Sequence, residues 1–267
     1  MPESDYVFEN GSAITVGRHG ETEYAFSNGS EIPNTGKSSF VFENGIGIGG
    51  VEFIQYDASA NGVLLNNGEE VNDGSDIDEW VDSQGIVNIT GGSPNRRDGG
   101  LDGKTVVNYD GANGTDYLDA SPDKVSFEQP FTVFAIPVTI EDRNIYAEYY
   151  ISSHPDGNDN VELRYANTPE SFSLDDSGNK LESSTSAETP ILLSGVVDDD
   201  KSVLRENGTE VASGTLTENL DGVRIGNNVN GDRSCGDLAE VRIYRENLIA
   251  EGTMEDIESD LMDKWGL

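Results

Sequence analysis

The sequence has 267 residues and a formal net charge of −35, because 51 acidic residues stand against only 16 basic ones. The acidic residues are spread along the chain, so the charge belongs to the whole surface, and no basic patch remains that could bind nucleic acid. This length allows one large all-β domain, or a small module followed by a medium-sized domain.

The negative charge also bears on the environment of the protein. A chain with this charge repels itself strongly in dilute buffer. At molar salt the Debye length falls to about 3 Å, so the repulsion is screened while hydrated carboxylates keep the protein in solution. The composition therefore favours a protein from a hypersaline organism, or from a virus that infects one. The alternative is an ordinary acidic protein.

Few residues are available for a disulfide, a zinc site or a membrane anchor. The single cysteine, Cys235, excludes an intrachain disulfide, and two histidines, His19 and His154, leave little material for zinc. No apolar run reaches the roughly 18 residues of a transmembrane helix. The first residues, "MPESDYVFEN", contain no secretory or twin-arginine signal. We therefore expect no membrane insertion and no export by a signal of this chain.

Three similar stretches of nine residues open the chain. They are "YVFENGSAI" (6–14), "YAFSNGSEI" (24–32) and "FVFENGIGI" (40–48). Each has Asn-Gly at its centre, between alternating apolar residues. Because both residues tolerate a positive φ, this pattern is typical of a β-hairpin with a two-residue type I′ turn. We expect residues 1–51 to form a small module of such hairpins.

A two-residue turn fixes which residues pair across each hairpin. The expected pairs are apolar: Val7 with Ile14, Ala25 with Ile32, and Val41 with Ile48. An aromatic pair precedes each turn and would lie on the opposite face: Tyr6 and Phe8, Tyr24 and Phe26, Phe40 and Phe42. Since a lone hairpin is marginal in water, we expect these aromatic residues to form a surface for oligomerisation or attachment. The alternative is a flexible tail.

From about residue 52 the pattern changes to short β-rich runs separated by glycine, proline, asparagine and aspartate. Examples are "FTVFAIPVTI" (131–140), "ILLSGVVD" (191–198) and "LAEVRIYRE" (238–246). Many short strands without intervening helices predict an all-β fold, a two-sheet antiparallel sandwich. The stretch "VLRENGTEV" (203–211) repeats the Asn-Gly spacing, so we interpret that spacing as a hairpin signal without sugar-binding content.

One helix is expected at the C-terminus. Thr253 can cap it, with Asp256 three residues later, and Gly266 can end it. Four apolar residues recur at helical spacing on one face: Met254, Ile257, Leu261 and Trp265. Five acidic residues are expected to lie largely away from that face: Glu255, Asp256, Glu258, Asp260 and Asp263.

Several motifs follow one another in an order seen in a known superfamily. They are "YDASANGVLL" (56–65), then Trp80, Asp82 and Gly85, then "VRIGNN" (223–228) and "GDLAEVRIYRENL" (236–248). This series resembles concanavalin A-like lectin/glucanase domains of the laminin-G-like type, over about residues 52–267. The resemblance implies a two-sheet jelly roll. It leaves function open, since that fold hosts lectins, glycosidases, adhesion modules and structural domains.

No catalytic pattern stands out. Glycosidases of the superfamily resemble one another in a Glu-x-Asp-x-(x)-Glu array on one strand. The nearest matches here are "MEDIESD" (254–260), on the expected helix, and "DIDEW" (76–80), and we interpret both as acidic surface. No G-x-S-x-G occurs, and His154 is the only histidine of the larger domain. We therefore expect a protein that is not an enzyme.

A sugar site needs an aromatic platform and planar polar groups. The candidate residues lie on neighbouring β-runs: Tyr149, Tyr150, Arg164 and Tyr165. The alternative is that half of them face the core, as strand alternation demands. The two arginines of "NRRDGG" (95–100) could bind an anionic sugar or a neighbouring subunit, or could form local ion pairs.

One loop offers hard oxygen ligands of the kind that Ca²⁺ prefers. Its candidate ligands are Asp156, Asn158 and Asp159. The loop lacks the full EF-hand pattern, and such clusters also arise by chance in an acidic chain. No other cofactor is implied.

Together these observations predict a surface structural protein of a halophilic archaeal virus, such as a capsid turret, decoration protein or tail-fibre tip. A virion protein reaches the outside by virus release, which reconciles a lectin-like domain with the lack of an export signal. The expected partners are further copies of the chain, other virion proteins and host glycans. The alternatives are a cellular carbohydrate-binding or adhesion module, and a glycoside hydrolase with a degenerate site.

Overall fold

The computed structural model describes residues 53–109, 116–140, 147–157, 160–167, 170–183, 190–227 and 236–267, and four short strands nearer the N-terminus. The chain divides into two compact units, Met1–Glu52 and Phe53–Leu267.

In the first unit, β1 (Tyr6–Val7) pairs with β2 (Ala13–Ile14), and β3 (Phe40–Val41) pairs with β4 (Gly47–Ile48). The expected register is wrong by one residue in both hairpins, because Tyr6 lies opposite Ile14 and Phe40 lies opposite Ile48. The paired strands of each hairpin are therefore joined by an odd number of residues and not by the even number that was expected. A shift of one residue in the register moves the side chains of a strand to the opposite face.

The remaining assignments in this unit were not tested by the structure. The hairpin that would join Ala25 to Ile32 lies outside the described residues. Four of the six aromatic residues expected to form an attachment surface also lie outside them: Phe8, Tyr24, Phe26 and Phe42. The other two, Tyr6 and Phe40, begin β1 and β3, but their side chains are not described. The attachment surface stays a prediction.

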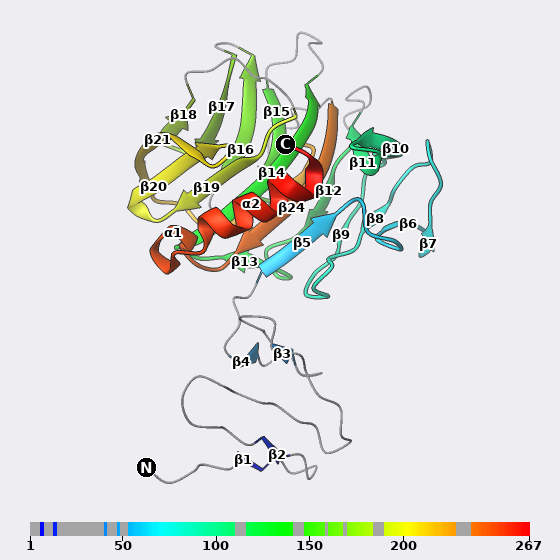
Figure 1. The fold of residues 1–267 in the computed structure, drawn as a ribbon, viewed down its shortest axis with the longest axis horizontal. Helices are drawn as coiled ribbons and strands as arrows, with labels where there is room; N and C mark the ends of the chain where they lie inside the picture. The colour runs from blue at the N-terminus through cyan, green and yellow to red at the C-terminus, as the bar shows by residue number, and fades with distance from the viewer. Residues whose placement is uncertain are drawn as a thin grey trace. The chain divides into compact units, whose positions relative to one another are not determined.

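The second unit contains two large antiparallel sheets (Figure 1). The first has eight strands. Its path is β10 (Asn95–Leu101), β11 (Lys104–Tyr109), β24 (Gly236–Tyr244), β14 (Phe131–Ile140), β19 (Leu193–Val197), β20 (Asp199–Glu206) and β21 (Thr209–Leu216), and β5 (Phe53–Asp57) also pairs with β24.

The second sheet has ten strands. Its order is β18 (Lys180–Glu182), β17 (Glu170–Asp175), β16 (Glu162–Asn167), β15 (Ala147–Ser152), β23 (Val223–Ile225), β12 (Leu118–Ala120), β9 (Ile89–Thr90), β8 (Glu79–Trp80), β6 (Leu64–Asn66) and β7 (Glu69–Glu70). A small pair, β13 (Ser126–Phe127) and β22 (Leu220–Asp221), completes the unit. The predicted all-β sandwich is confirmed.

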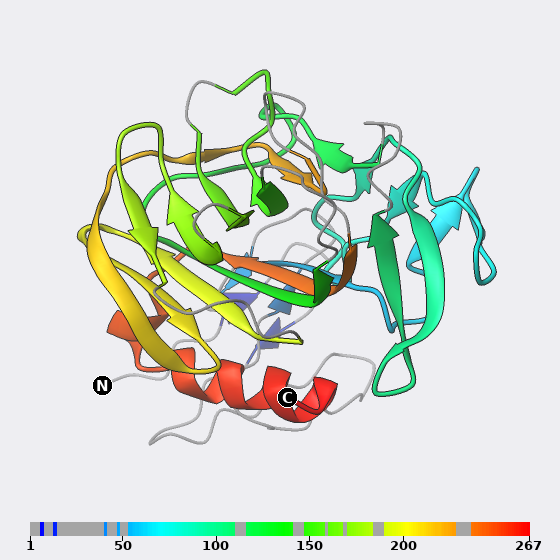
Figure 2. The same cartoon turned by 90° about the horizontal axis from the view of Figure 1, so that it is seen from above.

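The core lies between the two sheets, and most strands contribute to it, with core residues alternating along strands such as β12 and β16. Strand β14 is buried on both faces. Its residues from Phe131 to Val138 are all buried, including Thr132 and Phe134, whose side chains lie on the face away from the core. The reason is α2 (Met254–Trp265), which packs on the outer side of the eight-stranded sheet (Figure 2). Burial on both faces explains why "FTVFAIPVTI" is an almost continuous apolar run.

The C-terminal helix was predicted correctly in its bounds but not in all its contacts. Gly266 ends it in the left-handed region, and Met254, Leu261 and Trp265 are buried. Thr253 makes no side-chain capping bond, and Glu258 is buried rather than solvent-exposed. A separate turn, α1 (Leu248–Glu251), precedes α2 and is capped by Asn247. No helix in the described ranges is both long and apolar enough to cross a bilayer.

Candidate functional site

The ten-stranded sheet carries a line of polar side chains on the face away from the core. Asp119 of β12 lies opposite Arg224 of β23, and Arg224 lies opposite Ser152 of β15. Ser152 lies opposite Glu162 of β16, which lies opposite Asp175 of β17. Residues in direct register share a face with Cβ atoms about 5 Å apart. We call these five residues the polar row.

Local sequence explains why these residues share a face. On β16 the core residues Leu163 and Tyr165 alternate with Glu162 and Arg164. On β15 a bulge between Tyr149 and Ile151 inserts one extra residue. The bulge turns both Tyr150 and Ile151 toward the core and leaves Tyr149 and Ser152 on the polar face.

The polar row is recessed although it lies on an outer face. The four charged members of the row, and Arg164 next to Glu162 on β16, have side chains that keep between 8% and 24% of their area exposed. Charged groups with so little access to water need partners. The structure provides them as two clusters, one around each arginine.

The first cluster is centred on Arg164. Its Nε and Nη2 atoms donate to the same oxygen of Asp175, Oδ2, at 2.9 and 2.5 Å, and Nη1 donates to the Tyr149 hydroxyl at 3.2 Å. Glu162 Oε2 lies 3.6 Å from Arg164 Nε. Ser173 occupies the position opposite Arg164 on β17. One guanidinium therefore orders a carboxylate and a tyrosine on the same face.

Burial governs the ionisation of Asp175. It raises the pKa of the Asp175 carboxyl, and the ion pair with Arg164 offsets this only in part. The second oxygen of that carboxylate, Oδ1, is buried and accepts no hydrogen bond from the residues that the structure describes. The same is true of Oδ1 of Asn160. The Ser173 hydroxyl is also buried, and its hydrogen bond to the Asp175 carboxyl acts with Arg164 to lower the pKa that burial raises.

The second cluster is centred on Arg224. Its Nε and Nη2 atoms donate to Asp119 Oδ2 at 3.1 and 2.6 Å, and its guanidinium carbon lies 4.3 Å from the centre of the Tyr117 ring. His154 Nε2 is 3.5 Å from the same Asp119 oxygen, while His154 Nδ1 accepts the backbone N–H of Asp156. Both clusters thus combine a tyrosine, an arginine and an aspartate.

The predicted sugar-binding residues separate into two groups. Tyr149 and Arg164 lie together on the polar face, as described above. Tyr150 and Tyr165 belong to the core, where each packs against Phe172 with ring centres 6.4 and 5.5 Å apart. The sequence analysis left open that half of the four candidates face the core, and Tyr150 and Tyr165 do so.

The arginines of 95–100 make ion pairs within the second unit. Arg96 binds Glu70 and Asp98 at 2.9 and 2.8 Å, and Arg97 binds Asp237 at 2.6 Å. Only the Arg96–Asp98 pair is local in the sense that the sequence analysis considered; Glu70 and Asp237 lie on other strands.

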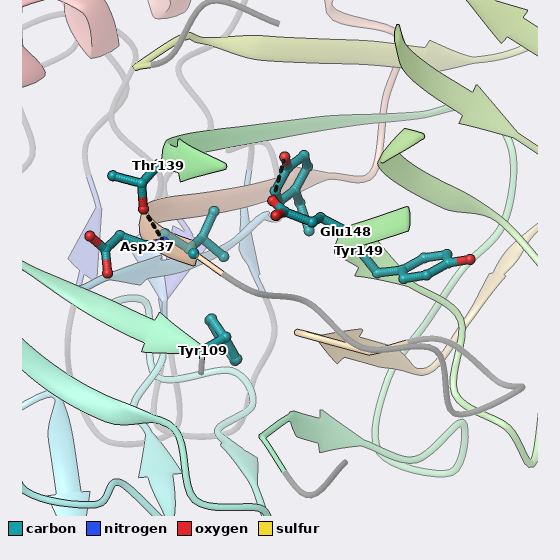
Figure 3. Close-up of a pocket in the computed structure, with 8 residues that line it drawn as sticks. Tyr109, Thr139, Glu148, Tyr149 and Asp237 are labelled. Carbon is teal, nitrogen blue, oxygen red and sulfur yellow. Dashed lines mark hydrogen bonds between the residues drawn. The ribbon is translucent and has the colours of Figure 1, made fainter. Parts of the chain in front are cut away.

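A pocket lies where β11 and β14 end and β15 and β24 begin (Figure 3). Glu148, Tyr109 and Thr139 line it, and the Tyr150 hydroxyl donates to Glu148 Oε2 at 3.3 Å. Burial, followed by the charge of Glu148, raises the pKa of Tyr150. The Tyr149 ring points away from Glu148 (Figure 3). The pocket has room for about one water molecule, so a sugar does not fit.

The predicted calcium ligands are only partly described. The Asp156 side chain is 83% exposed, with Oδ2 3.7 Å from His154 Nδ1. Asn158 and Asp159 lie outside the described residues, so the calcium site stays a prediction. Among the residues that are described, no group of three or more His, Cys, Asp or Glu side chains is placed to hold a metal ion.

Sequence reasoning missed most of the polar row. Asp119, Arg224 and Ser152 are far apart in the chain, and only strand pairing brings them into register. A weak signal was present in "SFSLD" (171–175), where serines alternate with apolar residues and Asp175 follows, as in a strand with one polar face.

Comparisons with known proteins give a limited likeness. No protein-family model and no curated protein matches the sequence. One similar solved structure is domain 4 of AbnA, an extracellular GH43 arabinanase from Geobacillus stearothermophilus, in complex with arabinotriose. It is 16% identical to this chain, with a TM-score of 0.48, and the match covers 73% of this chain and 92% of that domain. Trypanosoma rangeli sialidase is 14% identical, with a TM-score of 0.45 and coverage of 78% and 33%. The chain thus spans about a third of that sialidase.

Proposed function

We propose that residues 53–267 form a carbohydrate-binding domain of the concanavalin A-like, laminin-G-like type. The domain belongs, in this proposal, to a structural protein on the surface of a halophilic archaeal virus and attaches the particle to host glycans. The first unit, residues 1–52, provides oligomerisation or attachment to other virion proteins.

The observation that carries the proposal is the polar face of the ten-stranded sheet. It combines the guanidinium groups of Arg164 and Arg224 with carboxylates and with the partly buried Tyr117 ring. Planar polar groups next to an aromatic ring are what sugar sites use to bind hydroxyl groups and the apolar side of a sugar ring. Ion pairs hold these side chains in place, so little conformational entropy is lost when a ligand binds.

The amino-acid composition supports the proposed high-salt environment. A net charge of −35 suits a protein surface in contact with brine, where salt screens the repulsion between carboxylates. The same charge opposes a role in direct binding of nucleic acid.

Binding of the full chain to an array of neutral and acidic oligosaccharides at about 1 M KCl, where screening is nearly complete, tests the carbohydrate role. We expect saturable binding that is reduced in the variant Arg224→Gln. Absence of binding to every oligosaccharide would refute this role. Mass spectrometry of purified particles tests the setting: a fixed copy number per particle is expected, and absence from particles would contradict it.

The proposal treats the domain as a binding module and not as a glycosidase. Glu162 and Asp175 do lie opposite each other, and retaining glycosidases hold two carboxyl groups about 5–5.5 Å apart. Burial raises the pKa of Asp175, but Nε and Nη2 of Arg164 both occupy its Oδ2 atom and its Oδ1 atom is buried. Neither oxygen is therefore placed to give a proton to a glycosidic bond. Incubation with polysaccharide at high salt should produce no new reducing ends, and their appearance would favour an enzyme.

A further inference from the structure

The sequence contains several copies of Asn-x-Ser/Thr, the tripeptide in which an asparagine amide can carry a covalently attached sugar. Their asparagines are Asn10, Asn28, Asn88, Asn113 and Asn207. Two of the copies, "NIT" (88–90) and "NGT" (207–209), lie within the described residues. Such tripeptides also arise by chance, so the surroundings of each amide decide whether it is available for modification.

The amide of Asn207 is available. Asn207 is exposed at the tip of the hairpin between β20 and β21. Its Oδ1 atom accepts the backbone N–H of Leu192 at 2.9 Å, which fixes the orientation of the amide. The nitrogen at the other end, Nδ2, makes no hydrogen bond with the residues that the structure describes. Thr209, whose hydroxyl completes the tripeptide, is exposed as well.

The amide of Asn88 is used for structure instead. This residue is half-buried between β8 and β9. Its Nδ2 atom donates to Glu79 Oε1 at 2.7 Å, and its Oδ1 atom accepts the backbone N–H of Asp82 at 3.1 Å. A sugar attached to this nitrogen would disrupt contacts that hold the loop after β8. The two tripeptides therefore have the same chemistry but differ in access.

The tip of the β20–β21 hairpin lies on the side of the sandwich that carries α2 (Figure 1). The Gly208 carbonyl accepts from Arg205, whose guanidinium also binds Glu258 of α2. Helix α2 packs on the outer side of the eight-stranded sheet, whereas the polar row lies on the outer side of the ten-stranded sheet. A sugar at Asn207 would therefore stand away from the polar row and leave it open.

From these contacts we infer that Asn207 is a glycosylation site and that Asn88 is not. The donor class is a sugar activated by a phosphate ester, either a sugar nucleotide or a lipid-linked sugar. The bond from C1 of the sugar to the phosphate oxygen breaks, a bond from C1 to Nδ2 forms, and the proton that Nδ2 loses leaves with the phosphate. This inference is independent of the carbohydrate-binding function, because it concerns a sugar that the protein carries and not one that it binds.

Mass spectrometry of peptides from the full chain, purified from its native host, tests the site. We expect a carbohydrate mass on the peptide that contains Asn207 and none on the peptide that contains Asn88. In the same host, Thr209→Ala should lose the modification and Thr209→Ser should keep it. Asn207→Gln should lose it too. Should that variant fail to fold without the bond to Leu192, the Thr209 pair still decides, because both variants retain Asn207.

A host that lacks the enzyme for transfer from lipid carriers distinguishes the donors. Loss of the modification there identifies a lipid-linked sugar, and its persistence identifies a sugar nucleotide; both results support the inference. An unmodified Asn207 in the native protein would overturn it. A sugar on Asn88 with Asn207 bare would also overturn it, because access would then not select the site.

Discussion

Single aspartates hold loops of this β-sandwich together by accepting backbone N–H groups. Asp82 is 2% exposed, and its two oxygens accept the N–H groups of Gln55, Gln84, Ile86 and Val87 at 2.7–3.2 Å. It therefore ties β5 to the loop that follows β8. Asp82 thus has a structural role that a count of 51 acidic residues does not show.

Replacing Asp82 tests this role. Asp82→Ala leaves four N–H donors without their acceptor, so the free energy of unfolding should fall by about 3 kcal/mol. Urea denaturation at constant high salt measures the change. The exposed Asp200 is the matched control, and Asp200→Asn should change stability by less than about 0.5 kcal/mol. Equal effects of the two variants would show that the loop does not depend on Asp82.

The ionisation of Asp176 should make the stability of the fold depend on pH. Burial opposes its charge, but the backbone N–H groups of Thr217, Gly178 and Asn179 outweigh burial and lower its pKa below the ordinary value of 3.8. A carboxyl whose pKa is lower in the folded state stabilises the fold above its unfolded pKa, and this contribution disappears as the pH falls through the folded pKa.

The comparison of wild type with Asp176→Asn isolates that contribution. The wild type should be the more stable protein above about pH 4, and the difference should shrink as the pH falls below 3.8. Denaturation curves at several pH values in one salt concentration measure it. A difference that stays constant across this range would exclude the ionisation of Asp176 as its cause.

At the scale of elements, α2 is attached to the eight-stranded sheet by buried polar contacts as well as by apolar ones. Glu258 accepts from Arg205 of β20 at 2.9 and 3.0 Å and from Ser194 of β19 at 2.5 Å. Glu240 of β24 accepts from Lys264 and from the Trp265 ring nitrogen at 2.5 and 2.8 Å. Directional bonds therefore specify the position of the helix, through Glu258 in its first half and through Lys264 and Trp265 at its C-terminal end.

A double-mutant cycle measures the Glu258–Arg205 pair. Arg205→Met leaves the Glu258 carboxylate buried without its ion pair, so we expect a loss of about 3 kcal/mol or more. The double variant with Glu258→Met should recover part of that loss. Lys180→Met, in the more exposed pair with Glu182, should cost less than about 1 kcal/mol. Additive single effects in the cycle would contradict a coupled pair.

For the whole molecule, the dominant property is the charge of −35. Repulsion between surface carboxylates destabilises the compact state, and added salt screens it. The buried pairs respond far less to salt than exposed ones do. Salt should therefore stabilise this protein through the surface and leave its internal contacts almost unchanged.

The unfolding temperature should accordingly rise when KCl increases from about 0.1 M to about 1 M, as the Debye length falls from about 10 Å to about 3 Å. Differential scanning calorimetry measures the shift. Sucrose is the control, because it favours burial without screening charge. An unfolding temperature that is constant in KCl would argue against a chain adapted to brine.

Local chemistry predicted much of the fold. Glu206 pairs with Thr209 across a turn in which Asn207 and Gly208 have φ values of 45° and 76°, as the Asn-Gly signal in "VLRENGTEV" predicted. Strand β14 has the bounds expected from its apolar run. The same Asn-Gly signal predicted the wrong register in the first unit, where Tyr6 and Phe40, and not Val7 and Val41, lie opposite Ile14 and Ile48.

The sequence by itself determined the acidic surface, the β-rich pattern of residues 53–267 and the C-terminal helix, because each follows from composition or from periodicity within one segment. Only the tertiary structure decided that Glu258 is buried, since its partners Arg205 and Ser194 lie on other strands. The same holds for the polar row, whose members come from five strands. Pairing between distant strands places such residues side by side, and no pattern within one segment records it.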